Sequence, residues 1–522
     1  MLRWGTLPIW LITISGMYTF SQHVREEGWL LVSPGLRVVH ILGWVGTIGL
    51  AVLPLVSWLG QGERVLGWLR KVVQLAGQLG WVLLPVLVGL GVAFPVLMMG
   101  RFQVYLAQDW TRQAVFVWLA ILGALCISAY WQKDWLESAL FSVLGMAVVY
   151  HMTTYFPHIT DYPFSLWWSE TTRFYLASTF FDQRIYGQDL PWVFRDLTRY
   201  LIQAVPFLIP DSPLWLHRLW QAALRFTTPY FTGMIIARRL KLAPRKLFWV
   251  FALWAGLYFF QGPVFYNLIV IVMLVFWLVD ARRFWKTLAA VAAISIFAGF
   301  SRINWVPMAG LLAAAFYLLE KPLQGKDLKS IARYLALPAV WVVVGAAAGL
   351  GAQQFWAASS GNPQEIYYAS FTSYLIKARL LPNPSYPLGI LPYTLIVTAP
   401  LLIFLGLGLR GWRKKWHPVR LLGIGAIIAV LFGGGILVSL KIGGGTNLHN
   451  MDVYLVVLLV VAVEYYFGRV VDEQGQPVKA KMPLWLKTLV VVMPVIFVVT
   501  FVGRSIAPLD KQAVQQNLAQ LQ

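Results

Sequence analysis

Apolar runs of about 17–20 residues recur along the whole chain, and they restrict its possible folds more than any other feature. Examples are WVLLPVLVGLGVAFPVLMM (81–99), YLVVLLVVAVEYYF (454–467) and TLVVVMPVIFVV (488–499). A helix of about 20 residues crosses the roughly 30 Å hydrocarbon core of a bilayer. The runs show no strand-like alternation, and a chain in lipid must satisfy its backbone polar groups internally. The sequence therefore predicts an all-α bundle of membrane helices.

The composition agrees with a membrane protein. Of the 522 residues, 59% are hydrophobic and 12% are charged, whereas soluble domains carry about 25% charged residues. The net charge of +21 would suggest a nucleic-acid partner in a soluble protein. Here the basic residues gather in short loops between apolar runs, which is typical of cytoplasmic loops. We therefore predict membrane lipids as partners and no nucleic acid.

The apolar runs and their flanks predict about fifteen helices, a polytopic protein with about 13–15 transmembrane helices. We expect them near 4–20, 36–58, 81–99, 114–130, 139–155, 215–236, 246–260, 263–280, 285–300, 304–319, 333–351, 390–408, 421–440, 450–468 and 484–503. With a cytoplasmic N-terminus, the four most basic loops all fall inside: 238–246, 281–286, 410–420 and 478–487. This alternation predicts an integral protein of the plasma (inner) membrane with an external C-terminus.

Two loops on the predicted outer side are long. The first, 156–214, is rich in aromatic and charged residues, and its segment 191–209 has the pattern of an amphipathic helix on the membrane surface. The second, 352–389, is rich in Ser, Asn, Gln and Pro. It could be a mobile flap over a site or a solvated connection.

The first outer loop also contains a dense group of charges within 158–187. Asp161 and Glu170 lie there among aromatic residues, together with the cations Arg173 and Arg184. Carboxylates at a membrane face can act as a general base or bind a metal ion. The same residues could instead form salt bridges that hold a surface helix.

A second candidate is Arg302, in the short outer turn FSRINWVPM (300–308). An arginine at such a position is costly unless it is paired or solvated. It could reach toward lipid headgroups, or it could bind a phosphate with its two-pronged guanidinium group.

The third candidate is the polar segment SLKIGGGTNLHNMDVY (439–454) between two strongly apolar helices. Consecutive glycines let backbone N–H groups converge on an anion, and the start of the following helix adds positive charge. A glycine-rich turn between helices is common, so the density of polar residues is the stronger signal. The candidate anion ligands are Lys441, Gly443, Gly444, Gly445, Asn447, His449 and Asn450.

The predicted alternation of helices puts all three candidates on one membrane face, although they are far apart in sequence. Acids, cations and a glycine turn at one face indicate a site for an anionic substrate that is attached to a lipid.

In this arrangement the chain resembles the GT-C superfamily of integral membrane glycosyltransferases, which use polyprenyl-phosphate-linked sugars. In that superfamily an early helix precedes a long external loop, and an acid near the start of this loop is the catalytic base. The matching features are the helix 139–155, the loop 156–214 and Asp161, while FSRINW and KIGGGTNLHNMD are similar to late outer segments. Four helices precede the expected first one, which divides the chain into an N-terminal extension (1–135) and a core (136–522).

The resemblance implies transfer of a sugar from a polyprenyl-phosphate donor to an acceptor hydroxyl in the cell envelope. Asp161, with Glu170 as second candidate, would act as the base, and a single displacement would invert the anomeric centre. Arg302, Lys441 and the amides of 443–445 would stabilise the leaving phosphate. Arg173 and Arg184 would also contact substrate. The outer loop has no Asp-x-Asp motif, so neither a metal ion nor another cofactor is expected.

Other classes of protein remain possible at this point. A transporter or flippase for a lipid-linked saccharide would need polar residues at the membrane midplane, for which Glu464 and His151 are the candidates. A structural subunit of a membrane complex would need stoichiometric partners. A polymerase or ligase of the O-antigen type would use a similar site but would transfer a glycan.

Overall fold

The chain forms helices at every position where a membrane helix is expected, so the all-α polytopic prediction is confirmed. The computed structural model describes residues 2–29, 33–98, 104–106, 108–132, 134–166, 169–193, 195–363, 365, 367, 373–443, 448–478, 480–501 and 511–521. Within these ranges, nine helices are long and apolar enough to cross a membrane, and no β-strand occurs. The protein is therefore a multi-pass membrane protein.

The chain divides into two compact units, 1–157 with 495–522, and 158–494. The sequence-based division at 135/136 into an N-terminal extension and a core stays a prediction; the boundary between the compact units lies at 157/158, so the helix expected at 139–155 belongs to the first unit. The first unit contains α1 (Leu2–Glu26), α3 (Pro34–Trp58), α4 (Gly62–Gly77), α5 (Leu83–Met98), α6 (Asp109–Trp131), α7 (Trp135–Thr153) and α22 (Lys511–Leu521).

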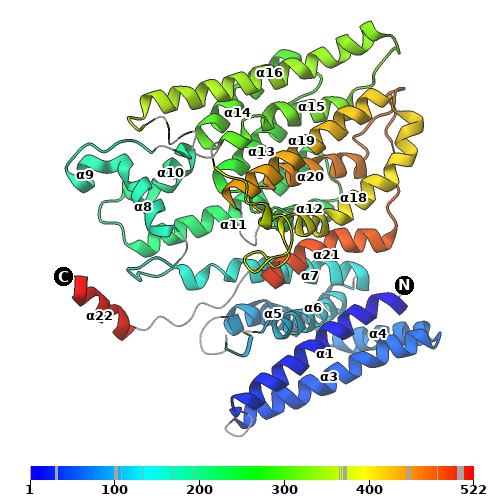
Figure 1. The fold of residues 1–522 in the computed structure, drawn as a ribbon. Helices are drawn as coiled ribbons and strands as arrows, with labels where there is room; N and C mark the ends of the chain where they lie inside the picture. Colours follow the sequence, from blue (N-terminus) through cyan, green and yellow to red (C-terminus); the bar gives the residue numbers. More distant parts are fainter. Residues whose placement is uncertain are drawn as a thin grey trace. The chain divides into compact units, whose positions relative to one another are not determined.

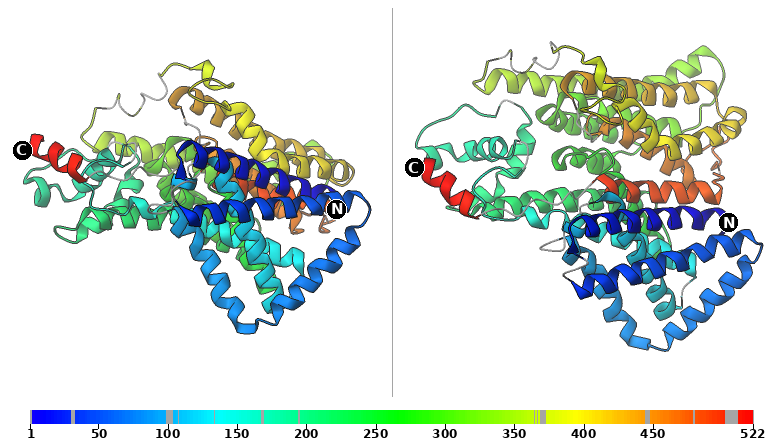
Figure 2. Two further views of the ribbon diagram at one scale, coloured as in Figure 1. Left: turned by 90° about the horizontal axis from the view of Figure 1, so that it is seen from below. Right: turned by 60° about the horizontal axis from the view of Figure 1, so that its bottom comes forward.

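Helix α4 of the first unit is not expected from hydropathy. Its sequence, GERVLGWLRKVVQLAG, places charged and apolar residues on different sides of the helix, so it lacks a continuous apolar run. Both views in Figure 2 show α4 and α5 diverging from a sharp bend at the short helix Gly80–Val82.

The second unit carries the long connection and the remaining membrane helices. The connection contains α8 (Glu170–Ser178), α9 (Asp182–Tyr186) and α10 (Leu197–Gln203). The bundle consists of α11 (Leu214–Arg239), α12 (Arg245–Tyr258), α13 (Tyr266–Leu278), α14 (Phe284–Ser301), α15 (Met308–Glu320), α16 (Leu328–Ser359), α18 (Ile390–Lys415), α19 (Pro418–Ile442), α20 (Asp452–Tyr466) and α21 (Leu484–Phe501), whose last residues belong to the first unit.

Several boundaries differ from the expectations. The surface helix expected over 191–209 is reduced to α10 and a short 3-10 turn, Val205–Leu208. Helix α16 continues to Ser359, so the loop expected to begin at 352 begins later. Hydropathy misses this end because the last two turns of α16 carry polar residues.

The core of the second unit is built around α20. Every residue from Asp452 to Tyr465 is buried, as expected for a helix that is apolar on all sides. The hydroxyl of Tyr258 on α12 donates a hydrogen bond to the carbonyl oxygen of Leu455 at 3.0 Å, which fixes α12 beside α20.

Glycines let α14 and α16 approach closely, and the two helices lie side by side in Figure 1. A Cβ atom at Gly299 would overlap the carbonyl oxygen of Gly349 on α16. Small residues at such contacts allow helix backbones to pack directly against each other in membranes. This contact holds the last turn of α14 in place, and that turn leads to Arg302.

Contacts between helix ends define two ends of the second unit. At the Arg302 end, Arg302 after α14 contacts Asn450 before α20. At the Arg239 end, Arg239 at the end of α11 contacts Glu320 at the end of α15, with 2.9 Å between Nη2 and Oε1. Successive helices run between these ends, as the sequence-based alternation requires.

The Arg239 end contains buried, paired charges. Arg239 also lies 3.8 Å from Oε1 of the fully buried Glu464. Arg420 is fully buried and donates to Oε1 of Glu473 at 2.9 Å and to the carbonyl oxygens of Leu318, Leu319 and Val471. These ion pairs and hydrogen bonds join α11, α15, α19 and α20.

Candidate functional site

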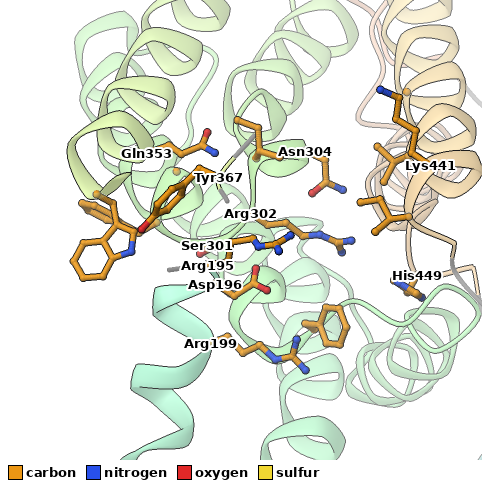
Figure 3. Close-up of a pocket in the computed structure, with 18 of the residues that line it drawn as sticks. Arg195, Asp196, Arg199, Ser301, Arg302, Asn304, Gln353, Tyr367, Lys441 and His449 are labelled. Carbon is orange, nitrogen blue, oxygen red and sulfur yellow. The ribbon is translucent and has the colours of Figure 1, made fainter. Parts of the chain in front are cut away.

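A cavity of about 550 Å³ opens at the Arg302 end of the second unit. Its walls come from the start of α10, the residue before α13, the ends of α14, α16 and α19, and the turn before α20. Figure 3 shows polar side chains directed into it from these separate elements. The cavity therefore joins segments that are more than 200 residues apart in sequence.

Arg302 enters the cavity directly after α14. Its backbone is extended, with φ −160° and ψ 129°, so the helix ends here and the side chain leaves the helix axis. Nη2 donates a hydrogen bond to Oδ1 of Asn450 at 2.7 Å, while the buried Nη1 has no protein acceptor within reach among the described residues. A buried guanidinium N–H without an acceptor is costly, so this group is poised to bind an anion.

Asn450 connects two of the segments singled out in the sequence. It accepts from Arg302 and donates through Nδ2 to the carbonyl oxygen of Gly443. Gly443 has φ +89°, a conformation that other residues rarely adopt, and this lets the chain turn sharply at the end of α19. The structure thus brings the FSRINW turn and the glycine turn together.

Lys441 and His449 line the same cavity on either side of that turn. The His449 ring lies 6.0 Å from the Phe265 ring. Gly444, Gly445 and Asn447 lie outside the described residues, so their predicted role stays a prediction. The end of α19 is capped by Arg379, whose Nη1 donates to the carbonyl oxygens of Leu440 and Lys441, both at 3.2 Å. Arg379 comes from the second long loop, which therefore supports the site.

Sequence reasoning did not identify three charged residues of the cavity: Arg195, Asp196 and Arg199. Arg195 and Arg199 are four residues apart, the spacing that puts side chains on one face of a helix. They lie in PWVFRDLTRYLIQAVPFLI, the segment taken for a surface helix. The spacing of Arg195 and Arg199 was the signal in the sequence that could have identified these residues. The aromatic and apolar residues around them favoured a helix on the membrane surface instead.

Asp196 is the only carboxylate among the described residues that line the cavity. It has φ +54°, in the left-handed region, although it is not glycine. It occupies the N-cap position of α10, yet its side chain makes no capping hydrogen bond. Strained backbone of this kind is concentrated at functional sites.

Arg199 is 8% exposed and lies with its guanidinium carbon 4.4 Å from the centre of the Phe265 ring. Its Nε and Nη2 have no protein acceptor within reach among the described residues. In the described part of the chain, the cavity therefore presents four basic side chains against one acid, and two of its arginines carry buried N–H groups for which that part supplies no acceptor. This arrangement suits a negatively charged ligand.

Asp161 and Glu170, the expected bases, do not line the cavity. Oε1 and Oε2 of Glu170 accept hydrogen bonds from Arg218 on α11 at 3.1 and 3.0 Å, in a pair that is almost fully buried. Oδ1 of Asp161 accepts from the backbone N–H of Trp215, in the first turn of α11, at 3.0 Å. These contacts fasten the segment 160–166 to α11, which corresponds to the salt-bridge alternative weighed for the sequence.

The other two expected substrate ligands also lie outside the cavity lining. Arg184 donates to the carbonyl oxygen of Phe207 and covers the Phe181 ring at 4.7 Å. Arg173 on α8 lies near Arg199. Burial, with the charges of Arg199 and Arg225, lowers the pKa of Arg173 to about 9, so it is still protonated at neutral pH.

Two observations bear on metal ions and on relatives. Within the described ranges, no group of three or more His, Cys, Asp or Glu side chains could hold a metal ion. Comparison of the chain with family models, with characterised proteins and with solved structures finds no match.

Proposed function

We propose that the protein is a membrane glycosyltransferase that moves a sugar from a polyprenyl-phosphate donor to an acceptor hydroxyl in the cavity at the Arg302 end. The observation that carries this proposal is the combination of buried arginine N–H groups, one carboxylate among the described lining residues and an apolar helix end around one cavity. An anionic lipid substrate requires the cations and the apolar wall, and hydroxyl activation requires the acid.

The donor phosphate binds between Arg302 and Lys441. As the bond between the anomeric carbon and the phosphate oxygen breaks, its electron pair passes to the phosphate, whose negative charge increases. Fixed cations aimed at this oxygen stabilise the transition state more than the ground state. Asn450 holds Arg302 in position through the 2.7 Å hydrogen bond, so the cation does not have to reorganise during the reaction.

Asp196 acts as the general base. Its carboxylate takes the proton of the acceptor hydroxyl while the hydroxyl oxygen attacks the anomeric carbon, so one proton moves to Asp196 and polyprenyl phosphate leaves. General-base catalysis of this kind contributes about 10²–10⁴-fold to the rate. Asp161 and Glu170 have other hydrogen-bond partners, and this favours Asp196 among the three acids.

The lipid tail leaves the cavity along α19. Gly434, Leu437, Val438 and Ile442 of this helix line the cavity. Leu437 and Ile442 are about half exposed, at 53% and 52%, on a helix that is apolar enough to cross the membrane. An apolar side chain exposed at membrane depth faces lipid, so the tail can remain in the bilayer while its phosphate enters the cavity.

The reaction takes place at the outer face of the plasma membrane, with the N-terminus in the cytoplasm. The support is the charge distribution: the basic loops 238–246, 281–286, 410–420 and 478–487 all belong to the Arg239 end, opposite the cavity. Basic loops remain cytoplasmic.

The test is a transfer assay with the full-length protein in lipid nanodiscs. Polyprenyl-phosphate sugars with a labelled sugar are supplied together with an extract of envelope glycans and lipids, and both labelled product and released polyprenyl phosphate are measured. We expect transfer with the wild type and a loss of about 10²–10³-fold with Arg302→Ala. Arg283→Ala is the matched control, because Arg283 is 71% exposed and belongs to the Arg239 end.

Two results would contradict the proposal. If Arg302→Ala transfers sugar at the wild-type rate, the phosphate is not held by this cation. If the donor crosses the membrane of liposomes while its sugar–phosphate bond stays intact, the protein is a flippase instead.

A further inference from the structure

Asp452 is a buried carboxylate at the Arg302 end that the proposed reaction does not use. It is the first residue of α20, its side chain is fully buried, and it is not among the described residues that line the cavity. Its Oδ2 accepts a hydrogen bond from Nε1 of Trp305 at 3.0 Å, and its Oδ1 accepts from the backbone N–H of Val453 at 2.8 Å. Burying a carboxylate is costly unless donors such as these satisfy it. Asp452 therefore has one partner on its own helix and one, Trp305, on a different element.

Trp305 belongs to the turn that carries Arg302. This turn is the 3-10 helix Ile303–Trp305, which begins directly after Arg302, and the indole of Trp305 is fully buried. The backbone N–H of Trp305 donates to the carbonyl oxygen of Arg302 at 2.9 Å. A contact that holds the indole in place therefore also holds the backbone from which the Arg302 side chain extends.

Two hydrogen bonds join this turn to the chain at the start of α20. Asp452 accepts from Trp305, close to the backbone of the turn. Asn450 accepts from Nη2 of Arg302 at 2.7 Å, at the far end of the arginine side chain. The two acceptors are two residues apart, and α20 is buried from Asp452 to Tyr465. The guanidinium group and its backbone are thus both fixed against the start of one buried helix.

We propose that Asp452 is a positioning residue for Arg302. Through Trp305 it holds the turn where the guanidinium group can contact the donor phosphate, although Asp452 itself touches no substrate. Figure 3 shows Arg302 extending toward the side of the cavity that Lys441 and His449 form. An active site must keep its groups within about 0.5 Å of the productive geometry, and the residues behind those groups supply this precision. The inference rests on the proposed function and adds a residue that acts on the reaction only through Arg302.

A carboxylate suits this task better than a neutral acceptor, because a hydrogen bond to an ionised oxygen is about twice as strong as one between neutral groups. The alternative role of Asp452 is stability alone, since an acid in the first turn of a helix interacts favourably with the helix dipole. The two roles differ in what a substitution changes. Loss of position lowers the rate of the folded protein, whereas loss of stability lowers only its unfolding temperature.

Trp305→Phe tests the link with the smallest change, because it removes the indole N–H and leaves an aromatic ring. With full-length protein in nanodiscs, kcat for sugar transfer should fall about 10- to 100-fold, while KM for the donor stays within about threefold. The negative charge of the phosphate increases in the transition state, so a displaced cation costs more there than in the donor complex.

Trp341→Phe is the matched control. Trp341 is also fully buried in the second unit, and its Nε1 donates to the carbonyl oxygen of Phe284 at 3.3 Å, at the Arg239 end. The substitution removes the same N–H group from the same kind of side chain. The unfolding temperature should fall in both tryptophan variants, but kcat should stay at the wild-type value in Trp341→Phe.

Substitutions of Asp452 supply a conservative and a disruptive case. Asp452→Asn keeps an oxygen that accepts from the indole, so kcat should remain within about tenfold of the wild type. Asp452→Leu removes the acceptor and should lose at least as much as Trp305→Phe. In the Arg302→Ala background, Trp305→Phe should cause no further loss of kcat, because residues that act through one contact are not additive.

Binding of polyprenyl phosphate, the product, separates failure of this inference from failure of the proposed function, because binding needs no turnover. Trp305→Phe should weaken it about tenfold, Arg302→Ala should weaken it further, and Trp341→Phe should leave it unchanged. The positioning role is overturned, and the proposed function stands, if Arg302→Ala impairs binding and transfer while Trp305→Phe impairs neither. It is also overturned if Trp305→Phe causes its full loss in the Arg302→Ala background. If the wild type neither binds the lipid nor transfers sugar, both proposals are wrong.

Discussion

Arginine side chains at the two ends of the second unit have different partners. At the Arg239 end, Arg239 and Arg420 are each matched by a glutamate, and Arg420 also donates to three backbone carbonyl oxygens. At the Arg302 end, Arg199 and Arg302 keep buried N–H groups for which the described residues supply no acceptor. Nε of Arg239 also lacks a hydrogen-bond acceptor among the described residues, but it lies 3.8 Å from Oε1 of Glu464, so a carboxylate compensates its charge. The N–H groups of Arg199 and Arg302 belong to side chains that line a cavity, where a ligand can accept from them.

The acidic residues at the two ends also differ in their partners. Glu320 and Glu464 at the Arg239 end lie against arginine, while Asp196 at the Arg302 end sits in a strained backbone conformation without capping its helix. The difference suggests that burial alone does not identify a functional charge. What identifies it is burial without a partner, next to a cavity.

The largest expected effect separates the acids of the two ends. Asp196→Asn should reduce sugar transfer by about 10²–10⁴-fold, because an amide cannot accept the proton of the acceptor hydroxyl. Its unfolding temperature should match the wild type, whereas Glu320→Gln should lower the unfolding temperature. Asp161→Asn provides the sharpest contrast: if it abolishes transfer and Asp196→Asn does not, the acid expected from the sequence is the base.

The next effect concerns stability. Arg420→Ala should destabilise the protein by about 3–5 kcal/mol, because Glu473 would remain partly buried without its cation. Arg302→Ala should cause a smaller loss, since Arg302 forms no ion pair: it donates to the neutral amide of Asn450 and interacts with the buried Asp452 only at longer range. Thermal unfolding in the same detergent measures both. Equal losses would remove the distinction between the two ends.

A smaller effect is expected from ligand binding. Polyprenyl phosphate at about 100 times its dissociation constant should stabilise the wild type by about 2.7 kcal/mol, because it binds only the folded protein. The increase in unfolding temperature should disappear in Arg302→Ala and persist in Arg420→Ala, provided that the latter is folded at the start. An increase that persists in Arg302→Ala would mean that the lipid binds elsewhere.

The smallest effect is at the surface of the Arg239 end. Arg283 lies 3.6 Å from Asp280, but its side chain is 71% exposed, so solvent screens the pair. Arg283→Ala should change the free energy of unfolding by less than about 1 kcal/mol and leave transfer unchanged. A larger change would show that exposed pairs also stabilise this end.

Hydropathy predicted the membrane helices because each apolar run carries its own signal, independent of its neighbours. It missed α4, whose charges interrupt the run, and the last turns of α16. The site was harder to predict. Counting helices was enough to predict that Arg302 and Lys441 lie at the same membrane face, since each directly adjoins a membrane helix.

The acids of the site, together with Arg195 and Arg199, could not be placed in that way. Asp161, Glu170 and Asp196 all lie in one long connection between membrane helices. Neither hydropathy nor a count of helices predicts where the residues of this connection lie in space. The buried partnership of Glu170 with Arg218 depends on how that connection folds back on α11. Only the three-dimensional path of the chain separates an acid that anchors the connection from one that faces the cavity.

The length of α16 determines how deep in the membrane the cavity lies. Its 32 residues extend about 48 Å, well beyond the roughly 30 Å of hydrocarbon. It begins at the Arg239 end, and Gln353 and Trp356, which line the cavity, come about 38 Å and 42 Å along the helix. An upright helix would carry them past the hydrocarbon to the level of the lipid headgroups. A phosphate at that level already lies beside the cavity, so the carrier would reach the site by lateral diffusion in its own leaflet.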